Sequence, residues 1–287
     1  QAPFLGDAPD AGDKDGTMPD QVRKLGIRDL RQRKQAGERI VSVTAYDAQM
    51  ARLVDEAGVD FILVGDSLGM TMLGYKTTIP VTMEDCLRHT AAVVRGTRRA
   101  MVIGDMPFLT CHLGAEEALR QAARFLQEAG ADGVKVEGGA EMAPAIRRMV
   151  QAGIPVMGHV GLLTQAVLAE GGYRVHGRTP EDADAVFADA VAVAEAGAFA
   201  VVLEGVTSSL AQRVTEALAV PTIGIGAGPH CDGQIQVLHD LLGLFEDFVP
   251  RHTKRYAELG AAVRQAIGAY GEDVRAGRFP GKEQSFT

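Results

Sequence analysis

Five short apolar segments of this chain, each long enough for one strand, end on an ionisable residue. In four of them an Ala-Gly pair, typical of a helix end, precedes the apolar run. The terminal residues are, in chain order, Asp66, Asp105, Glu137, His159 and Glu204. Apolar runs of this length that alternate with helical periodicity are typical of buried parallel strands. Because catalytic groups of a parallel α/β barrel lie at the C-terminal ends of its strands, the pattern predicts a fold and a metal-dependent active site.

Helical segments separate eight candidate strands, which fits a closed barrel better than an open doubly wound sheet. The predicted strands are 39–46, 61–66, 100–105, 133–138, 155–160, 199–204, 221–226 and 235–239. The predicted helices are Gln21–Gly37, Ala48–Glu56, Met83–Gly96, Ala115–Glu128, Glu141–Gln151, Pro180–Glu195 and Leu210–Leu218. We therefore assign the chain to the α/β class, as a (β/α)8 TIM barrel with an N-terminal helix and a C-terminal helical tail.

The barrel is predicted to form one domain over residues 21–287, because no Pro-, Ser- or Gly-rich linker divides the region 39–245. Residues 1–20 are rich in Asp, Gly and Pro and contain no apolar core. We interpret them as a disordered extension or a cloning remnant rather than a signal peptide. The tail from Arg251 to Thr287 is expected to be helical and then irregular. It could pack on a neighbouring subunit.

Composition argues against several classes of partner. The net charge of −8 argues against a nucleic-acid partner, since the two short basic clusters are interpreted as solvated helix faces. No apolar run reaches the ~18–20 residues that a membrane span needs. The three cysteines, Cys86, Cys111 and Cys231, are odd in number and show no zinc spacing. This usage favours a reducing compartment, so we expect a cytoplasmic protein.

Three carboxylates are expected together at one edge of the sheet, because Asp66, Asp105 and Glu137 end three consecutive strands. Carboxylate oxygens are the ligands that suit Mg²⁺ or Mn²⁺. A single acid at such a position is often only the cap of the next helix. Three on consecutive strands would repel one another without a compensating cation. The pattern therefore predicts a metal site.

Lys135, His159 and Glu204 are the other candidates for chemistry at this edge. Lys135 alternates with Glu137, so both are expected to face the barrel interior, where the ammonium could bind a substrate carboxylate or simply neutralise Glu137. The rim position of His159 favours a functional role over that of a satisfied core histidine. Glu204 has no cation beside it in the sequence, which makes it the best candidate for proton transfer.

A glycine-rich stretch, Gly224–Gly228, follows the seventh strand and resembles the loop that cradles phosphate in many barrels. Glycines at a strand end are weak evidence by themselves, and Asp232 would repel an anion. Close approach of a large ligand, or packing at the rim, accounts for the stretch equally well.

A dense series of motifs from about Leu25 to the C-terminus resembles the ketopantoate hydroxymethyltransferase family, within the phosphoenolpyruvate mutase/isocitrate lyase superfamily. The motifs are Thr44–Asp47, Leu63–Met70, Pro80–Thr82, Asp105–Phe108, Val134–Gly139, Gly158–Leu162, Gly171–Arg178, Ile223–Gly228 and Asp232–Gln234. Together they are highly specific, although no single one is. The chain departs from the family pattern at Leu163-Thr164-Gln165, where Thr-Pro-Gln is usual, and at Gln284, where many relatives have His.

The resemblance implies transfer of a hydroxymethyl group from the co-substrate 5,10-methylenetetrahydrofolate to 3-methyl-2-oxobutanoate. The product would be ketopantoate, formed through a Mg²⁺-stabilised enolate in the first step of pantothenate biosynthesis. The resemblance further implies one Mg²⁺ per subunit, held by Asp66 and Asp105 with Glu137 near it, and Glu204 as the catalytic acid or base. The keto acid site that it implies comprises Ser67, Asp105, Lys135 and His159. Known relatives form decamers, so we expect a homo-oligomer, specifically a homodecamer.

Two other functions stay open from the sequence. A C–C or P–C lyase or mutase of the same superfamily would use the same metal and enolate without folate. Its usual Lys-Lys-Cys-Gly-His loop does not occur here, and Gly74–Pro80 looks like the transferase. A non-catalytic barrel that binds a phosphate ligand is disfavoured, because a scaffold has no need of four rim carboxylates.

Overall fold

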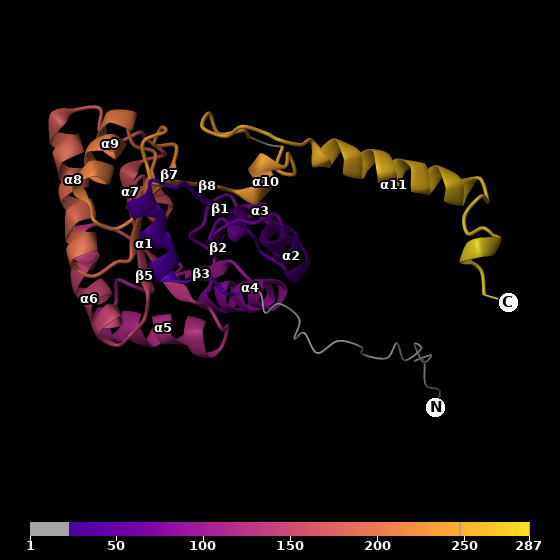
Figure 1. Cartoon of the computed structure of the whole chain (residues 1–287). Coiled ribbons are helices and arrows are strands. Elements are labelled where there is room, and N and C mark those ends of the chain that lie inside the picture. The colour runs from indigo at the N-terminus through magenta and orange to yellow at the C-terminus, as the bar shows by residue number, and fades with distance from the viewer. Residues whose placement is uncertain (1–22, 247, 287) are drawn as a thin grey trace.

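Eight parallel strands close into a barrel in the order of the sequence (Figure 1). The computed structural model describes residues 23–246 and 248–286, so segment 1–20, interpreted above as an extension or cloning remnant, lies outside the described residues. The strands are β1 (Ile40–Thr44), β2 (Phe61–Val64), β3 (Met101–Asp105), β4 (Gly133–Glu137), β5 (Val156–Gly161), β6 (Ala200–Glu204), β7 (Thr222–Ile225) and β8 (Gly233–Gln236). The predicted α/β class and the (β/α)8 barrel are confirmed.

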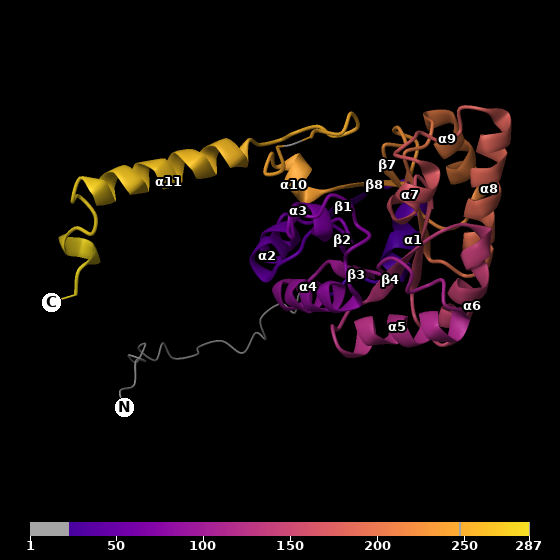
Figure 2. The same ribbon diagram turned by 180° about the vertical axis from the view of Figure 1, so that it is seen from behind.

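Helices cover the outside of the barrel, and all seven predicted helices are present (Figures 1 and 2). The helices are α1 (Ile27–Ala36), α2 (Ala48–Glu56), α3 (Leu68–Thr71), α4 (Met83–Gly96), α5 (Ala115–Gln127), α6 (Ala143–Gln151), α7 (Val167–Glu170), α8 (Pro180–Glu195), α9 (Ser208–Ala217), α10 (Leu238–Leu241) and α11 (Leu259–Arg275). Single 3-10 turns occur at Ala140–Met142, Thr164–Ala166 and Lys282–Gln284. Within the described residues, no helix is long and apolar enough to cross a membrane.

Most predicted bounds lie within two residues of the observed ones, but two elements depart further. The first helix begins at Ile27 rather than Gln21, because Gly26 caps it with an N–H that donates to Asp29 Oδ2 at 2.8 Å. The eighth strand is Gly233–Gln236 rather than 235–239. Pairing with β1 sets its start, since Gly233 lies opposite Ile40 and an added Cβ would come within 2.7 Å of the isoleucine side chain.

Side chains on the two faces of the strands form separate cores, because successive residues of a strand point to opposite sides. On β4, Val134 and Val136 belong to the outer core beneath the helices, whereas Lys135 and Glu137 line a cavity inside the barrel. The inner apolar core includes the fully buried Leu30 of α1 together with inward-facing strand residues, among them Ile40, Phe61 and Met101 near the N-terminal ends. Apolar packing therefore fills one end of the barrel, and the polar side chains collect at the C-terminal end.

The last helix, α11, extends away from the barrel in both views (Figures 1 and 2). None of its residues is buried. Its exposed apolar side chains include Val263, Ile267, Tyr270 and Val274, whose spacing of four, three and four residues places them on one face. The predicted helical tail is present, and its packing on a neighbouring subunit stays a prediction.

Candidate active site

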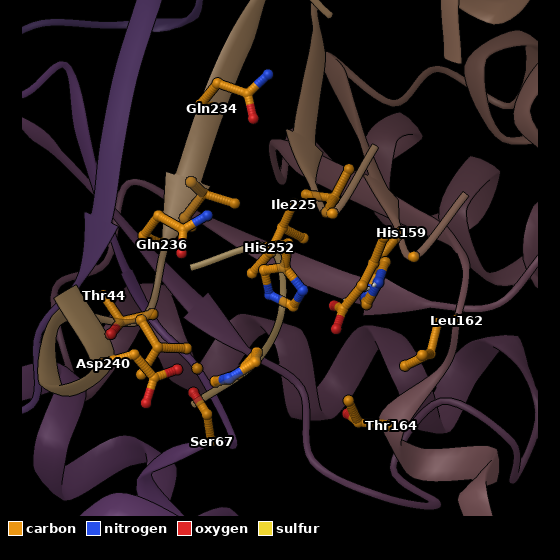
Figure 3. Close-up of a pocket in the computed structure, with 18 of the residues that line it drawn as sticks. Thr44, Ser67, His159, Leu162, Thr164, Ile225, Gln234, Gln236, Asp240 and His252 are labelled. Carbon is orange, nitrogen blue, oxygen red and sulfur yellow. Dashed lines mark ion pairs between the residues drawn. The ribbon is translucent and has the colours of Figure 1, made fainter. Parts of the chain in front are cut away.

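All seven residues predicted for the site line one cavity of about 1470 Å³ at the C-terminal end of the barrel. The residues are Asp66, Ser67, Asp105, Lys135, Glu137, His159 and Glu204. Strand register brings them side by side, because Asp105 pairs with Lys135 and Glu137 pairs with His159. Figure 3 shows Ser67 on one side of the cavity and His159 on the other.

Lys135 is the buried cation among the three carboxylates. Its Nζ lies 3.0 Å from Asp105 Oδ1 and 4.0 Å from Glu137 Oε1. Burial opposes the charge of the ammonium, but the carboxylates outweigh it and raise the pKa of Lys135 above its usual value. Asp105 also accepts the backbone N–H of Asp66 on Oδ2 at 2.9 Å. These contacts tie the ends of β2, β3 and β4 together.

Two of the carboxyls are less acidic than usual. Burial raises the pKa of Asp66 well above its ordinary value, and the charges of Asp105 and Glu137 raise it further. Burial also raises the pKa of Asp105, although Lys135 opposes the shift. Both shifts have the sign expected where one ammonium does not fully offset three buried carboxylates.

Glu137 is held by the loop that follows β5. Thr164 Oγ1 donates to Glu137 Oε1 at 3.0 Å, and the backbone N–H of Gln165 donates to Oε2 at 2.9 Å. Burial opposes ionisation of this carboxyl, but the hydrogen bond from His159, together with Lys135, outweighs it and lowers the pKa of Glu137 to about 2. Thr164 and Gln165 belong to the segment where the sequence departs from the family pattern, so the residues present there still serve the site.

His159 connects Glu137 with Glu204. Its Nδ1 lies 3.2 Å from Glu137 Oε1, and its Nε2 lies 3.2 Å from Glu204 Oε2. Nδ1 is also 3.1 Å from Lys135 Nζ, and it could accept from that ammonium only when unprotonated. Burial and the charge of Lys135 oppose protonation, but the bonds to the two glutamates outweigh them and raise the pKa of His159 to about 9. A protonated imidazole within ion-pair distance of both glutamates is therefore the favoured state.

Two residues that contact the site were not predicted from the sequence. Gln165 Nε2 donates to Asp66 Oδ2 at 3.1 Å and to the Met106 carbonyl at 3.0 Å. The Tyr46 hydroxyl lies 2.9 Å from Ser67 Oγ. Gln165 stands in the segment that departs from the family pattern, and Tyr46 stands in the motif Thr44–Asp47, but neither segment indicates its contact, because each contact joins positions far apart in the chain.

The glycine-rich stretch after β7 is accounted for by packing at the rim. A Cβ on Gly228 would lie 2.5 Å from Ser208 Oγ, and a Cβ on Gly226 would lie 3.2 Å from His252 Nδ1. Both glycines also have positive φ, of 76° and 62°. Side chains at these positions would therefore be disfavoured whether or not a phosphate binds.

The carboxylates fit the chemistry of a hard divalent cation, although no group of three His, Cys, Asp or Glu side chains in the described part of the chain stands preassembled around a metal position. Asp66, Asp105 and Glu137 offer oxygen ligands only, as Mg²⁺ prefers. The raised pKa values of Asp66 and Asp105 arise from burial and from repulsion by neighbouring carboxylates, which a cation would offset. The metal roles of these residues stay predictions.

Solved structures of low sequence identity share the fold. Phosphonopyruvate hydrolase, in a complex with oxalate and Mg²⁺, aligns with a TM-score of 0.56 and 16% identity over 91% of this chain and 93% of that chain. 2,3-Dimethylmalate lyase, a member of the phosphoenolpyruvate mutase/isocitrate lyase superfamily, aligns with a TM-score of 0.59 and 20% identity, covering 92% and 89% of the two chains. These likenesses extend over nearly the whole barrel.

Closer relatives name a family. The 3-methyl-2-oxobutanoate hydroxymethyltransferase of Chloroflexus aurantiacus is 57% identical over 262 residues, which are 91% of this chain and 92% of the relative. The enzyme of the same name from Moorella thermoacetica is 51% identical over 266 residues, 93% of this chain and 99% of the relative. A family model described as ketopantoate hydroxymethyltransferase matches residues 24–282. The chain therefore belongs to the ketopantoate hydroxymethyltransferase family of enzymes.

Proposed function

We propose that this chain transfers a hydroxymethyl group from 5,10-methylenetetrahydrofolate to 3-methyl-2-oxobutanoate and so makes ketopantoate, in the first step of pantothenate biosynthesis. The observation that carries the proposal is the placement of Lys135, His159 and Glu204 beside three carboxylates in one cavity. In the reaction, C3 of the keto acid loses a proton and bonds to the methylene carbon of the donor. Water then supplies the hydroxyl group, and tetrahydrofolate leaves.

The cavity has room for both substrates. Its volume of about 1470 Å³ exceeds the ~300–1,000 Å³ of a typical small-molecule pocket. In this proposal the Lys135 ammonium binds the carboxylate of the keto acid as a point charge, while Ser67, Asp105 and His159 complete the keto acid site. The side chain of Lys135 is 5% exposed, so this interaction would be screened little by solvent.

Asp66 and Asp105, with Glu137 near them, would hold one Mg²⁺ per subunit. Bound there, Mg²⁺ would act as the Lewis acid that stabilises the negative charge that develops on the keto oxygen when C3 loses its proton. The oxygen-only donor set supports this assignment. So does the Mg²⁺ in the phosphonopyruvate hydrolase complex, which has the same fold.

Glu204 is proposed as the group that moves the proton, either at C3 or at the new hydroxyl. Its side chain is 20% exposed, more than those of the other site acids, and its Oε2 lies 3.2 Å from His159 Nε2. This contact orients the carboxylate while leaving it open to the cavity. A base within hydrogen-bond reach of a positioned substrate is the geometry that proton transfer requires.

The Glu204→Gln variant tests the proposal. Ketopantoate formation from both substrates and Mg²⁺ should be abolished, while binding of Mg²⁺ and of the keto acid, measured by calorimetry, should survive. Glu195→Gln, a change of the same kind at an exposed position near the end of α8, serves as the control. Retained turnover in Glu204→Gln would contradict the role of Glu204 in proton transfer. A wild-type enzyme that makes no ketopantoate would refute the proposed function.

A second measurement separates the two proton-transfer steps. In D₂O without folate, the wild-type enzyme should exchange the C3 proton of 3-methyl-2-oxobutanoate for deuterium. Loss of exchange in Glu204→Gln assigns Glu204 to C3, whereas exchange without product assigns it to the new hydroxyl. Cleavage or rearrangement of a C–C or P–C bond in a related 2-oxo acid, without folate, would instead favour the lyase or mutase alternative.

We further propose a homo-oligomer, expected to be a decamer, in which α11 packs on a neighbouring subunit. The exposed apolar face of α11 supports this, because burial of such a face stabilises association. Light scattering should give a mass near ten chains, and Ile267→Glu should lower it. Gln265→Glu adds the same charge about 200° around the helix, away from the apolar face, and should leave the mass unchanged. A monomeric wild type would contradict the proposal.

We also place the enzyme in the cytoplasm, which its three free, buried cysteines support.

A further inference from the structure

The motif Thr44–Asp47 contains a tyrosine that the proposed mechanism does not use. Tyr46 follows β1 and is only 1% exposed. A buried phenol normally needs a hydrogen-bond partner for its hydroxyl. In this structure that hydroxyl lies 2.9 Å from Ser67 Oγ. The tyrosine thus reaches a residue that the proposed function places at the keto acid.

Tyr46 is held at three points. Its ring packs against the ring of His239, with centroids 5.4 Å apart at an angle of 43°. Its carbonyl oxygen accepts a hydrogen bond from His89 Nδ1 at 2.6 Å. Its hydroxyl makes the contact with Ser67. Because α4 holds the backbone of Tyr46 while α10 and the segment after β2 contact its side chain, the hydroxyl presents a stationary partner.

Ser67, by contrast, has few constraints of its own. It occupies the N-cap position of α3, but its side chain makes no capping hydrogen bond. Beneath it lies Gly65, where a Cβ would come within 2.8 Å of Ser67 Oγ, so the glycine leaves space for the hydroxyl. A serine side chain has three staggered rotamers, and the bond to Tyr46 favours one of them.

We propose that Tyr46 is a positioning residue that fixes the Ser67 hydroxyl toward the keto acid. When Tyr46 donates its proton to Ser67 Oγ, the Ser67 O–H is left free to donate to the substrate carboxylate. Without Tyr46, the substrate would have to order the Ser67 hydroxyl, and this ordering would reduce the free energy of substrate binding. The inference rests on the proposed function, because it assumes that Ser67 contacts the keto acid.

Tyr46→Phe tests the inference while keeping the ring against His239. One well-oriented hydrogen bond is worth about a fivefold to tenfold change in affinity, so the KM and the Kd for 3-methyl-2-oxobutanoate should rise by about that factor. The value of kcat should change less than about twofold, because the residue acts on binding rather than on the chemical step. Tyr256→Phe, at an exposed tyrosine whose ring lies under Lys254, is the matched control and should change neither.

The decisive measurement is a double-mutant cycle. Ser67→Ala should weaken keto acid binding by itself, and adding Tyr46→Phe should then cause less than about a twofold further loss. If the two losses multiply, Tyr46 acts independently of Ser67 and the inference is wrong. An unchanged Kd in Tyr46→Phe would overturn it as well.

Two further readouts separate positioning from a structural role and from failure of the function. The unfolding midpoints of the wild type, the two single variants and the double variant should show coupling between Tyr46 and Ser67 even without substrate. If Tyr46→Phe lowers the midpoint equally in both Ser67 backgrounds, the hydrogen bond is not formed and the inference fails. A wild-type enzyme that does not bind the keto acid would refute the proposed function itself, and the role of Tyr46 would fall with it.

Discussion

The packing of β5 against α8 leaves no room for a side chain at Gly158, the residue before His159. A Cβ added to Gly158 would lie 2.1 Å from Val193 Cγ1, which is 1.3 Å short of the 3.4 Å at which ordinary contact begins. The next nearest atoms, Val193 Cβ and Ala198 Cβ, lie at 3.5 and 3.9 Å, which are ordinary contacts. The conflict is therefore confined to one methyl group, which makes Gly158 and Val193 a suitable pair for a double-mutant cycle.

The expected magnitudes follow from this geometry. Gly158→Ala overpacks a core that is already closed and should lower the free energy of unfolding by about 1–3 kcal/mol. Val193→Ala removes two buried methyl groups and leaves a small cavity, which should cost about 2–3 kcal/mol. In the double variant the new methyl group occupies the space that Cγ1 vacates. Its total cost should therefore be about 1–2 kcal/mol smaller than the sum of the two single costs.

Urea unfolding of the four proteins, followed by circular dichroism at one protein concentration, measures this coupling. The concentration is held constant because oligomerisation would contribute to apparent stability. Additive single costs, within about 0.5 kcal/mol, would show that the two side chains do not compete for the same space. Activity offers a second check: Gly158→Ala should lower turnover by displacing His159, and Val193→Ala in the same chain should restore part of it.

Two further predictions concern the residues around the carboxylates. Gln165→Leu removes the amide that donates to Asp66. Because loss of a hydrogen bond to a metal-ligating carboxylate weakens metal binding, the Kd for Mg²⁺ in calorimetry should rise about 10-fold. An unchanged Kd would contradict the role of Gln165. In the metal-free enzyme the folded pKa of His159, about 9, exceeds the ordinary 6.5. The contribution of His159 to the free energy of unfolding should be complete below pH 6.5 and lost as the pH rises to about 9. His159→Gln should therefore flatten the pH dependence of the urea midpoint in that range. An unaltered slope would show that another group is responsible.

The strands and the acids at their ends could be predicted because both depend on local pattern. A run such as Phe61–Val64 is apolar on both faces, which only a strand covered on both sides requires. Parallel strands in a barrel have their C-terminal ends at one edge, so Asp66, Asp105 and Glu137 had to lie near one another once the fold was known. The alternation of Lys135 with Glu137 likewise fixed a common direction for both.

Other features depend on contacts between distant parts of the chain. The start of β8 is set by close approach to Ile40, and nothing in the local sequence of Gly233 indicates which strand it will meet. The bond between Gln165 and Asp66 joins residues 99 positions apart, and it required the loop after β5 to fold over the ends of β2 and β4. The contact of Tyr46 with Ser67 similarly required two strand ends to be neighbours in the barrel.

The barrel, the order of its strands and the acids at its rim thus follow from local patterns in the chain. Periodicity and burial are properties of each segment, and they can be read one segment at a time. Which atoms meet depends on the three-dimensional packing: His159 lies between Glu137 and Glu204, Gln165 contacts Asp66, and Tyr46 contacts Ser67. Such contacts follow from strand register and from the way loops pack over the rim, because a side-chain hydrogen bond forms only when its two atoms come within about 3 Å.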